Sequence, residues 1–111
     1  MEISCGDVVL AVAPGDYGKP RPAVVVQSDL FNPTHASIVV CPITSLGIDA
    51  PLFRLSIVPS TANGIRTESQ VMIDKVMALK RERIRRRVGR LPAVEMQAIE
   101  QALRLWLGLE P

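Results

Sequence analysis

The chain has 111 residues, a formal net charge of +2 at pH 7 and a hydrophobic fraction of 48%. This length predicts one small domain with its own core, and a charge so near neutral argues against a protein that holds nucleic acid by bulk electrostatics. The composition supplies a single histidine, His35, and two cysteines, Cys5 and Cys41, without metal-ligand or redox-motif spacing. A zinc or histidine-based site is therefore not expected, and the cysteines fit small core residues of a reducing compartment.

The N-terminus predicts no targeting segment. Residues 1–7 lack a basic start followed by an apolar stretch, and no run in the chain approaches the length that spans a bilayer. We therefore expect a cytoplasmic protein without membrane association.

The first half of the chain predicts a hairpin. Residues 8–13 form a short β-favouring run between Gly-Asp and Pro-Gly, and residues 23–27 form a second run. The polar loop of residues 14–20 is long enough to carry function.

Arg21 stands between two prolines at the entrance of the second run. Pro20 and Pro22 fix their own φ angles and bias the preceding residues toward extended geometry. A guanidinium held in this way suits a phosphate, because its planar fork offers paired donors and never deprotonates. The alternative is a solvated turn with a rigid strand start.

The central part predicts three further strands. Residues 37–44 form one, with Pro42 indicating an edge or a bulge near its end, and residues 52–58 and 70–76 form the others. The polar, turn-rich residues 59–67 between the last two are too few for a linker between domains.

The last third predicts a short helix over residues 77–84, a strand over residues 85–90 and a terminal helix that starts near Pro92. The apolar face of that helix includes Trp106, which we expect to be a buried anchor. The expected fold is mainly β (α+β), a small antiparallel barrel with a C-terminal helix packed against it.

Seven of the thirteen lysines and arginines lie between Lys80 and Arg90. This basic run fits a track for an RNA backbone, because each cation on a phosphate adds salt-dependent affinity. It fits a solvated surface equally well, since Glu82 offsets part of its charge.

Polar side chains gather on the predicted connections, and their types suit phosphodiester cleavage without a metal. Arg21 and the hydroxyl of Thr44 or Ser45 can stabilise charge on phosphate oxygens, and Asp16 or Asp74 can take a proton from a ribose 2′-OH.

Five ordered segments carry a resemblance across nearly the whole chain. They are Gly6-Asp7-Val8-Val9, then Gly18 to Gln27, Val40 to Ser45, Ser69 to Val76 and Val88 to Leu91. In this order and spacing they resemble the MazF/PemK family of toxin endoribonucleases. The resemblance implies one domain over residues 1–111 with an SH3-like barrel of the kind shared with CcdB. It also implies a homodimer, ribosome-independent cleavage of single-stranded RNA to 2′,3′-cyclic phosphate and 5′-OH ends, no metal or other cofactor, and a co-expressed antitoxin.

The resemblance also implies roles for particular residues. Arg21 matches the arginine that acts on the scissile phosphate, and Thr44 matches the threonine that hydrogen-bonds the same phosphate. Asp16 occupies the acidic position before that arginine. Asp74 matches a strand acid that some members use as general base, and we slightly prefer it to Asp16.

The chain departs from the family pattern at three points. Its first loop is short and reads Asp16-Tyr17-Gly18-Lys19, Met72 stands where the PemK-type branch has a catalytic arginine, and Lys75 replaces a common glutamine. Tyr17 is the expected base contact, because an aromatic ring beside Arg21 can stack on a base. The predicted RNA contacts are Tyr17, Lys19, Ser45, Gln70, Lys75, Lys80 and Arg81.

Two alternatives remain at this point. One is a CcdB-like poison of DNA gyrase on the same barrel, which depends on a Trp-Gly-Ile type end, whereas this chain ends Leu105-Trp106-Leu107-Gly108-Leu109-Glu110-Pro111. The other is an inert interaction module with a decayed site. The antitoxin expected for the nuclease is MazE-like, with an acidic, partly disordered tail that covers the basic run.

Overall fold

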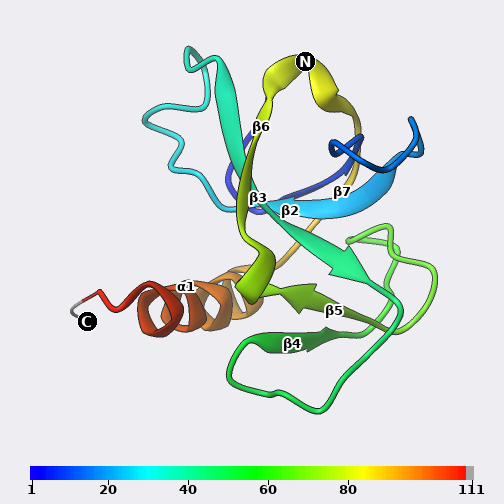
Figure 1. The fold of residues 1–111 in the computed structure, drawn as a ribbon, viewed down its shortest axis with the longest axis vertical. Helices are drawn as coiled ribbons and strands as arrows, with labels where there is room; N and C mark the ends of the chain where they lie inside the picture. Colours follow the sequence, from blue (N-terminus) through cyan, green and yellow to red (C-terminus); the bar gives the residue numbers. More distant parts are fainter. Residues whose placement is uncertain (110–111) are drawn as a thin grey trace.

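A computed structural model describes residues 1–109, which form seven β-strands, two short 3₁₀ turns and one α-helix. The strands are β1 (Asp7–Ala11), β2 (Arg21–Val25), β3 (Ser37–Thr44), β4 (Arg54–Ile57), β5 (Ser69–Met72), β6 (Met77–Lys80) and β7 (Ile84–Arg90). The 3₁₀ turns are η1 (Ile73–Lys75) and η2 (Arg81–Arg83), and the helix is α1 (Ala93–Leu107). Figure 1 shows α1 lying alongside the β4–β5 end of the molecule.

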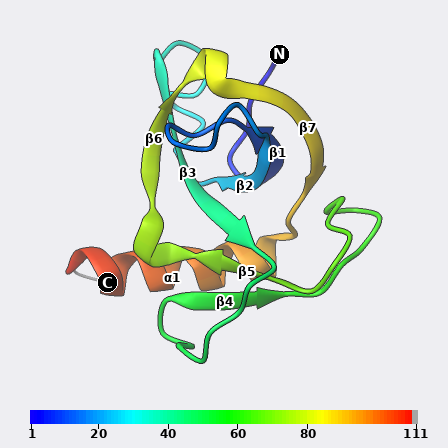
Figure 2. The same cartoon turned by 45° about the vertical axis from the view of Figure 1, so that its right-hand side comes forward.

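The sheet is antiparallel with strand order β4-β5-β3-β2-β1-β7, and β6 pairs with β3 beside this path. The expected hairpin is confirmed, since β1 pairs with β2 from Val8 opposite Val24 to Ala11 opposite Arg21. Figure 2 shows β6 and β7 arching around β1 and β2. The mainly β class with a C-terminal helix is therefore confirmed. The barrel is open, because no ladder within residues 1–109 joins the end strands β4 and β7.

Both faces of the central strands are buried, which explains their uninterrupted β-branched runs. Val8, Val24 and Cys41 belong to one core, which α1 closes with Ile99 and Ala102. Their neighbours along the strands belong to a second core inside the β6–β7 arch, made of Ile3, Val9, Ala11, Ala23, Val25, Ile38, Val40, Leu79 and Ile84. Because successive side chains of a strand point to opposite faces, one sheet contributes residues to two cores.

Pro42 lies at the place where β3 changes partners, not at an outer edge. The N-terminal half of β3 pairs with β6 up to Val40 opposite Met77, and the end of β3 pairs with β5 from Ile43 opposite Val71. Pro42 itself faces Ala23 of β2 in register. A residue without an N–H is tolerated here, because the ladder on one side is interrupted by η1.

Two local predictions are wrong. Residues 77–84 form β6 and η2 in place of a helix, because β3 supplies a pairing partner from Ser37 opposite Lys80 to Val40 opposite Met77. Tertiary pairing thus overrides the helix-forming tendency of Met, Ala, Leu and Lys. The strand expected over residues 70–76 ends at Met72, so Asp74 lies in the η1 turn.

The terminal helix α1 follows Pro92 as expected, and Gly108 ends it in the left-handed conformation at φ 69°. The burial expected for Trp106 is wrong, since the residue is 48% exposed, although its ring packs on that of Phe53 with ring centroids 5.4 Å apart. The reason is that the helix extends beyond the core after Leu103, and residues 104–109 are exposed. No helix among residues 1–109 is long and apolar enough to cross a membrane.

Candidate functional site

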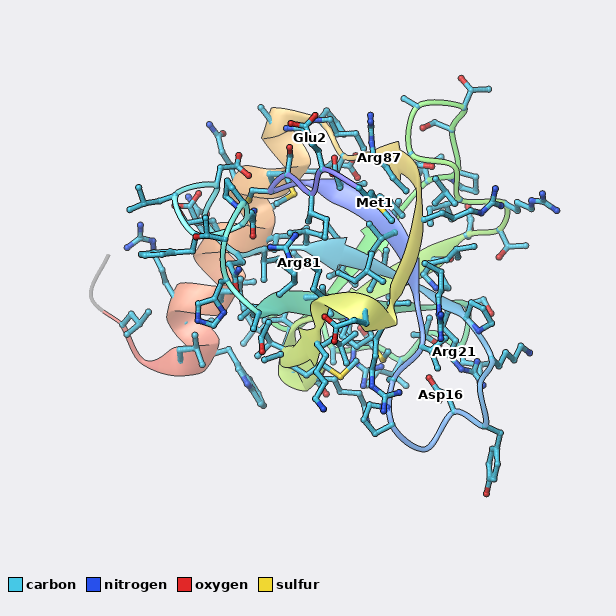
Figure 3. All side chains as sticks on the ribbon, turned by 90° about the horizontal axis from the view of Figure 1, so that it is seen from above. Met1, Glu2, Asp16, Arg21, Arg81 and Arg87 are labelled. Atoms are coloured by element: carbon cyan, nitrogen blue, oxygen red, sulfur yellow. The ribbon has the colours of Figure 1, made fainter. Side chains whose placement is uncertain are left out.

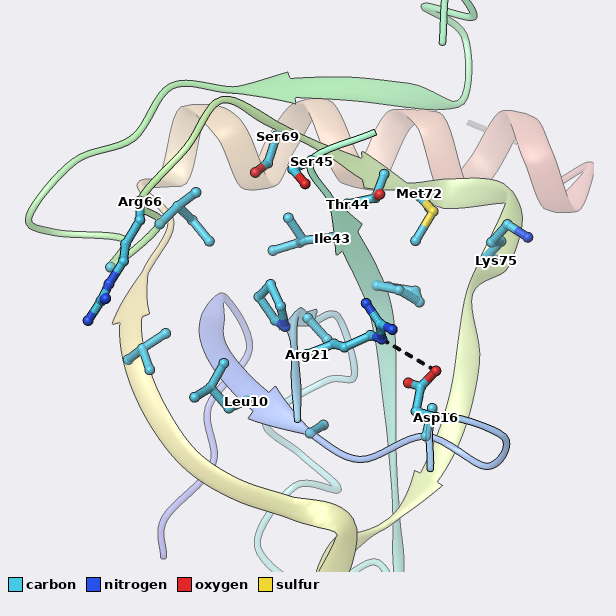
Figure 4. Close-up of a pocket in the computed structure, with 18 of the residues that line it drawn as sticks. Leu10, Asp16, Arg21, Ile43, Thr44, Ser45, Arg66, Ser69, Met72 and Lys75 are labelled. Carbon is cyan, nitrogen blue, oxygen red and sulfur yellow. Dashed lines mark ion pairs between the residues drawn. The ribbon is translucent and has the colours of Figure 1, made fainter. Parts of the chain in front are cut away.

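A cavity of about 1030 Å³ opens between the β1–β2 hairpin, the end of β3, the β4–β5 loop, the β5–β6 turn and β7 (Figure 4). Of the described residues, five basic side chains and one acidic side chain line it. The basic residues are Arg21, Arg66, Lys75, Arg86 and Arg87, and the acid is Asp16. A concave site with this excess of positive charge suits an anionic ligand.

Arg21 and Asp16 form an ion pair on the wall of the cavity. The Nε atom of Arg21 lies 3.4 Å from Oδ1 of Asp16, and the two side chains are 55% and 26% exposed. The loop between them is folded by two backbone bonds, from Asp16 N to Ala13 O at 3.2 Å and from Lys19 N to Asp16 O at 2.9 Å. Figure 3 shows the two side chains together at the loop end of the hairpin. The pair is loose enough for a bound anion to replace the carboxylate on the guanidinium.

Thr44 ends β3 and faces the same cavity as Arg21 (Figure 4). Its Oγ1 atom accepts a hydrogen bond from the backbone N–H of Leu46 at 3.1 Å. Since the hydroxyl already accepts this bond, its own hydrogen is available to donate into the cavity. Ser45 follows it on the exposed rim.

The turn after β5 supplies a mixed wall. Met72 and Lys75 both line the cavity, on the side of it where Asp16 lies (Figure 4). Met72 brings an apolar surface without charge, whereas the ammonium group of Lys75 is exposed and can reach an anion. Of these two residues, only Lys75 can supply positive charge to this side of the cavity.

Asp74 does not line the cavity. Its two carboxylate oxygens accept hydrogen bonds from Nε and Nη2 of Arg54, at 2.8 and 3.1 Å. The side chains of Arg54 and Asp74 are only 9% and 17% exposed. The hydrogen bonds from Arg54 hold the pKa of Asp74 below its usual range, and those same bonds raise the pKa of Arg54. A carboxylate engaged at both oxygens is a poor proton acceptor, so of the two candidate acids only Asp16 is placed to act on a ligand in the cavity.

The predicted RNA contacts divide by location. Tyr17 and Lys19 project from the β1–β2 loop, where Tyr17 is fully exposed with a positive φ of 53°. Gln70 is occupied in structure, because its amide exchanges two hydrogen bonds with the backbone of Ile48, at 3.1 and 2.9 Å. Lys80 is exposed on β6 away from the cavity lining.

Arg81 is also occupied. Its guanidinium donates to the carbonyl of His35 at 3.0 and 3.2 Å and to the carbonyl of Asn32. It therefore fixes the turn of residues 28–36 to η2. Neither Gln70 nor Arg81 lies free to contact a ligand without breaking these bonds.

Sequence reasoning missed Arg66 as a cavity residue and Arg54 as the partner of Asp74, and it did not distinguish Arg86 from the rest of the basic run. Arg54 stands alone in a short, imperfect strand pattern, and its pairing with Asp74 spans 20 residues. Arg66 lies in a segment that reads as a polar turn, and Arg86 is one of several arginines in the basic run. The only signal available was the residue type, which did not indicate the direction of the side chain.

The cysteines show no sign of chemistry. Burial, with a contribution from nearby Asp74, raises the pKa of Cys41 to about 12, so its thiol stays protonated in the core as expected. Cys5 is half-buried, and desolvation raises its pKa as well. Within residues 1–109, no three His, Cys, Asp or Glu side chains gather in a group able to hold a metal ion.

Comparison with known proteins gives one consistent family. The family described as "PemK-like, MazF-like toxin of type II toxin-antitoxin system" matches residues 4–107. The "Probable endoribonuclease MazF" of Mycolicibacterium smegmatis is 45% identical over 105 residues, which cover 94% of this chain and 95% of that protein.

Solved structures agree with the fold. "Mycobacterium tuberculosis toxin MazF-mt6" superposes with a TM-score of 0.81 at 20% identity, covering 95% of this chain and 99% of the other. "Endoribonuclease in complex with its cognate antitoxin from Mycobacterial species" also has a TM-score of 0.81 at 20% identity, with 98% of each chain covered. At this identity the two structures support the fold and no more.

Proposed function

The chain belongs to the PemK-like, MazF-like family of toxins of type II toxin–antitoxin systems, and from this we propose that it is an endoribonuclease. It cuts single-stranded RNA at a short sequence, independently of ribosomes and of metal ions. The observation that carries the proposal is the arrangement of Arg21, Asp16 and Thr44 in one cavity with a surplus of positive charge.

The chemistry follows from the positions of these three side chains. The scissile phosphate takes the place of Asp16 on the guanidinium of Arg21, and the hydroxyl of Thr44 donates to a non-bridging oxygen of the same phosphate. Asp16, released from Arg21, accepts the proton of the ribose 2′-OH as this oxygen attacks phosphorus. Arg21 stabilises the charge that develops on the phosphorane oxygens. The bond to the 5′-oxygen breaks, leaving a 2′,3′-cyclic phosphate and, after protonation by water, a 5′-OH.

The proposal includes the setting in which the enzyme acts. We infer a single domain over residues 1–111 that works in the cytoplasm as a homodimer and is held inactive by an antitoxin with an acidic tail. Exposed apolar side chains near the end of α1, among them Leu105 and Leu107 at 61% and 55% exposure, offer surface that association would bury. Sedimentation of the purified protein distinguishes a dimer from a monomer.

The test is cleavage of a long single-stranded RNA by the purified protein in EDTA, with the new 5′ ends mapped. We expect discrete cuts with 5′-OH ends, and strong loss of cutting in Arg21→Ala and Thr44→Ala. Undiminished cutting by Arg21→Ala would overturn the site. Absence of cutting, together with gyrase-dependent DNA breaks, would favour the CcdB-like alternative, and absence of both would favour an inert module.

A further inference from the structure

The basic run from Lys80 to Arg90 is not one uniform surface. Arg83 donates to the carbonyl of Val12 at 3.3 Å, and Arg81 is bonded to backbone carbonyls as described above. Arg87 and Arg90 both face the buried carboxylate of Asp7, with N–O distances of 3.4 and 2.9 Å. Most of the arginines in the run are thus engaged in holding the fold together.

The guanidinium groups of Arg85 and Arg86 make no hydrogen bond or ion pair with any of residues 1–109, and the two side chains differ in position. Arg86 pairs in register with Leu10 of β1, and both residues line the cavity. Arg85 does not line it, because the register shifts between Leu10 and Ala11 and leaves Arg85 as the extra residue of a β-bulge. Two adjacent arginines of one strand therefore offer a natural comparison.

Arg66 joins Arg86 at the cavity from a loop that is firmly anchored. Asn63 is 2% exposed and ties the loop together, accepting from Ser60 N and Ile65 N and donating to Val58 O. Gly64, with φ +71°, packs against the Val88 carbonyl of β7, and a Cβ there would clash with it. The backbone next to Arg66 is therefore fixed against the strand that carries Arg86.

Arg66 lies at the outer rim of the cavity (Figure 4). It is exposed, is among the cavity-lining residues and makes no ion pair with any residue of the described range 1–109. Figure 4 shows it on the side of the cavity away from Asp16 and Lys75, beside β7. A cavity of about 1030 Å³ exceeds the usual size of a pocket for one small ligand, so it has room beyond the phosphate at Arg21.

We propose that Arg66 and Arg86 form a second phosphate subsite, which holds a phosphate of the RNA strand other than the scissile one. This subsite rests on the proposed endoribonuclease function, since it gives the strand a second fixed point and so a direction across the cavity. Two unpaired guanidiniums on anchored backbone suit a phosphate, because each presents a fork of donors.

The experiment measures binding separately from cutting. A fluorescent single-stranded RNA with 2′-O-methyl sugars cannot be cut, because the attacking hydroxyl is blocked, and its anisotropy gives Kd over a series of salt concentrations. We expect Arg66→Ala and Arg86→Ala each to raise Kd roughly three- to tenfold and to lower the salt slope by about 0.7, the value for one lost contact to a single strand. Arg66→Lys keeps the charge and should recover most of the slope.

The matched control is Arg85→Ala, which removes the same charge one position away, outside the cavity lining. It should leave Kd within about twofold of the unmodified protein, because an exposed charge that makes no direct contact with the RNA is weakened by salt. Equal effects of Arg85→Ala and Arg86→Ala would overturn the subsite and indicate a general charge effect. Loss of affinity for the antitoxin without loss of affinity for RNA would also overturn it. Failure of the proposed function itself is seen separately, as absence of cutting in unmodified RNA.

Discussion

Asp16 and Arg21 meet at a single contact of 3.4 Å in the cavity, whereas Asp74 and Arg54 form a two-point pair at 2.8 and 3.1 Å. Arg21 is 55% exposed, and Arg54 is 9% exposed. An exposed pair with one long contact contributes about 0–1 kcal/mol to folding and is easily replaced by another anion. A largely buried pair with both oxygens satisfied resists replacement, because breaking it strands a charge away from water.

One aspartate–arginine pair is thus placed to bind a ligand, and the other stabilises the fold. The loose pair joins the β1–β2 loop to the first residue of β2, and both residues line the cavity. The tight pair joins β4 to η1, and neither of its residues lines the cavity. We therefore expect substitutions in the first pair to act on catalysis and substitutions in the second to act on stability. Each prediction below would weaken or strengthen this division.

The largest effect is expected for Arg21→Ala. Removing one preorganised donor to a developing negative charge typically lowers kcat by about 10²–10³-fold, and here the neighbouring Met72 offers no replacement. The free energy of unfolding should change by less than about 1 kcal/mol, because the pair with Asp16 is exposed. Single-turnover cleavage and urea unfolding measure the two quantities. A loss of stability comparable to the loss of activity would contradict the division.

The next effect is expected for Arg54→Met. It leaves the carboxylate of Asp74 without a partner at a site 17% exposed, which should lower the free energy of unfolding by about 3 kcal/mol. The double variant Arg54→Met/Asp74→Leu removes both charges and should recover much of this loss. Urea unfolding of the two variants gives the comparison. Cleavage per folded molecule should fall far less than in Arg21→Ala, and a collapse of kcat in a folded Arg54→Met protein would place this pair in the active site.

The sequence predicted much of the fold because the relevant signals are local. β-branched runs bounded by glycine and proline located the hairpin and the strand over residues 37–44, and an amphipathic pattern after Pro92 located α1. It failed at residues 77–80, where helix-forming side chains pair with β3 some forty positions earlier in the chain. The local sequence does not indicate which distant segment a strand will pair with.

The site could be predicted only in part for the same reason. The prolines around Arg21 and the end of β3 at Thr44 pointed to two residues that the fold does bring to one cavity. The roles of Asp74 and Arg81 depend on partners 20 and 46 residues away, Arg54 and His35, which a single sequence does not reveal. Arg66 reaches the cavity because Gly64 allows close packing against β7, a contact between distant segments.

A smaller effect on catalysis is expected for Asp16→Asn. An amide keeps the size of the side chain and cannot accept the 2′-OH proton, so kcat should fall roughly hundredfold, which is the lower end for loss of a general base. Asp74→Asn is the matched control, since it makes the same chemical change in the tight pair. Its folded molecules should cut at close to the original rate while their stability falls. If the two variants exchange these effects, Asp74 is the base and the division is wrong.

The smallest effect is expected from acid. Hydrogen bonds from Arg54 lower the pKa of Asp74 in the folded protein, so this pair adds stability that is fully present above the unfolded value of about 3.9 and is lost as pH falls through the folded pKa. Asp29 behaves likewise, because bonds from Cys5 N and Asn32 lower its pKa. Urea unfolding at pH 7 and in the acid range measures the difference in free energy of unfolding between the original protein and Asp74→Asn. This difference should become smaller as the pH falls. Asp29→Asn removes the contribution of Asp29 to the pH dependence of stability. In that background, the effect of Asp74→Asn on the free energy of unfolding should still become smaller in acid. A difference that stays constant would mean that Arg54 holds Asp74 no more tightly in the folded chain than in the unfolded one, and that the two aspartate–arginine pairs are alike.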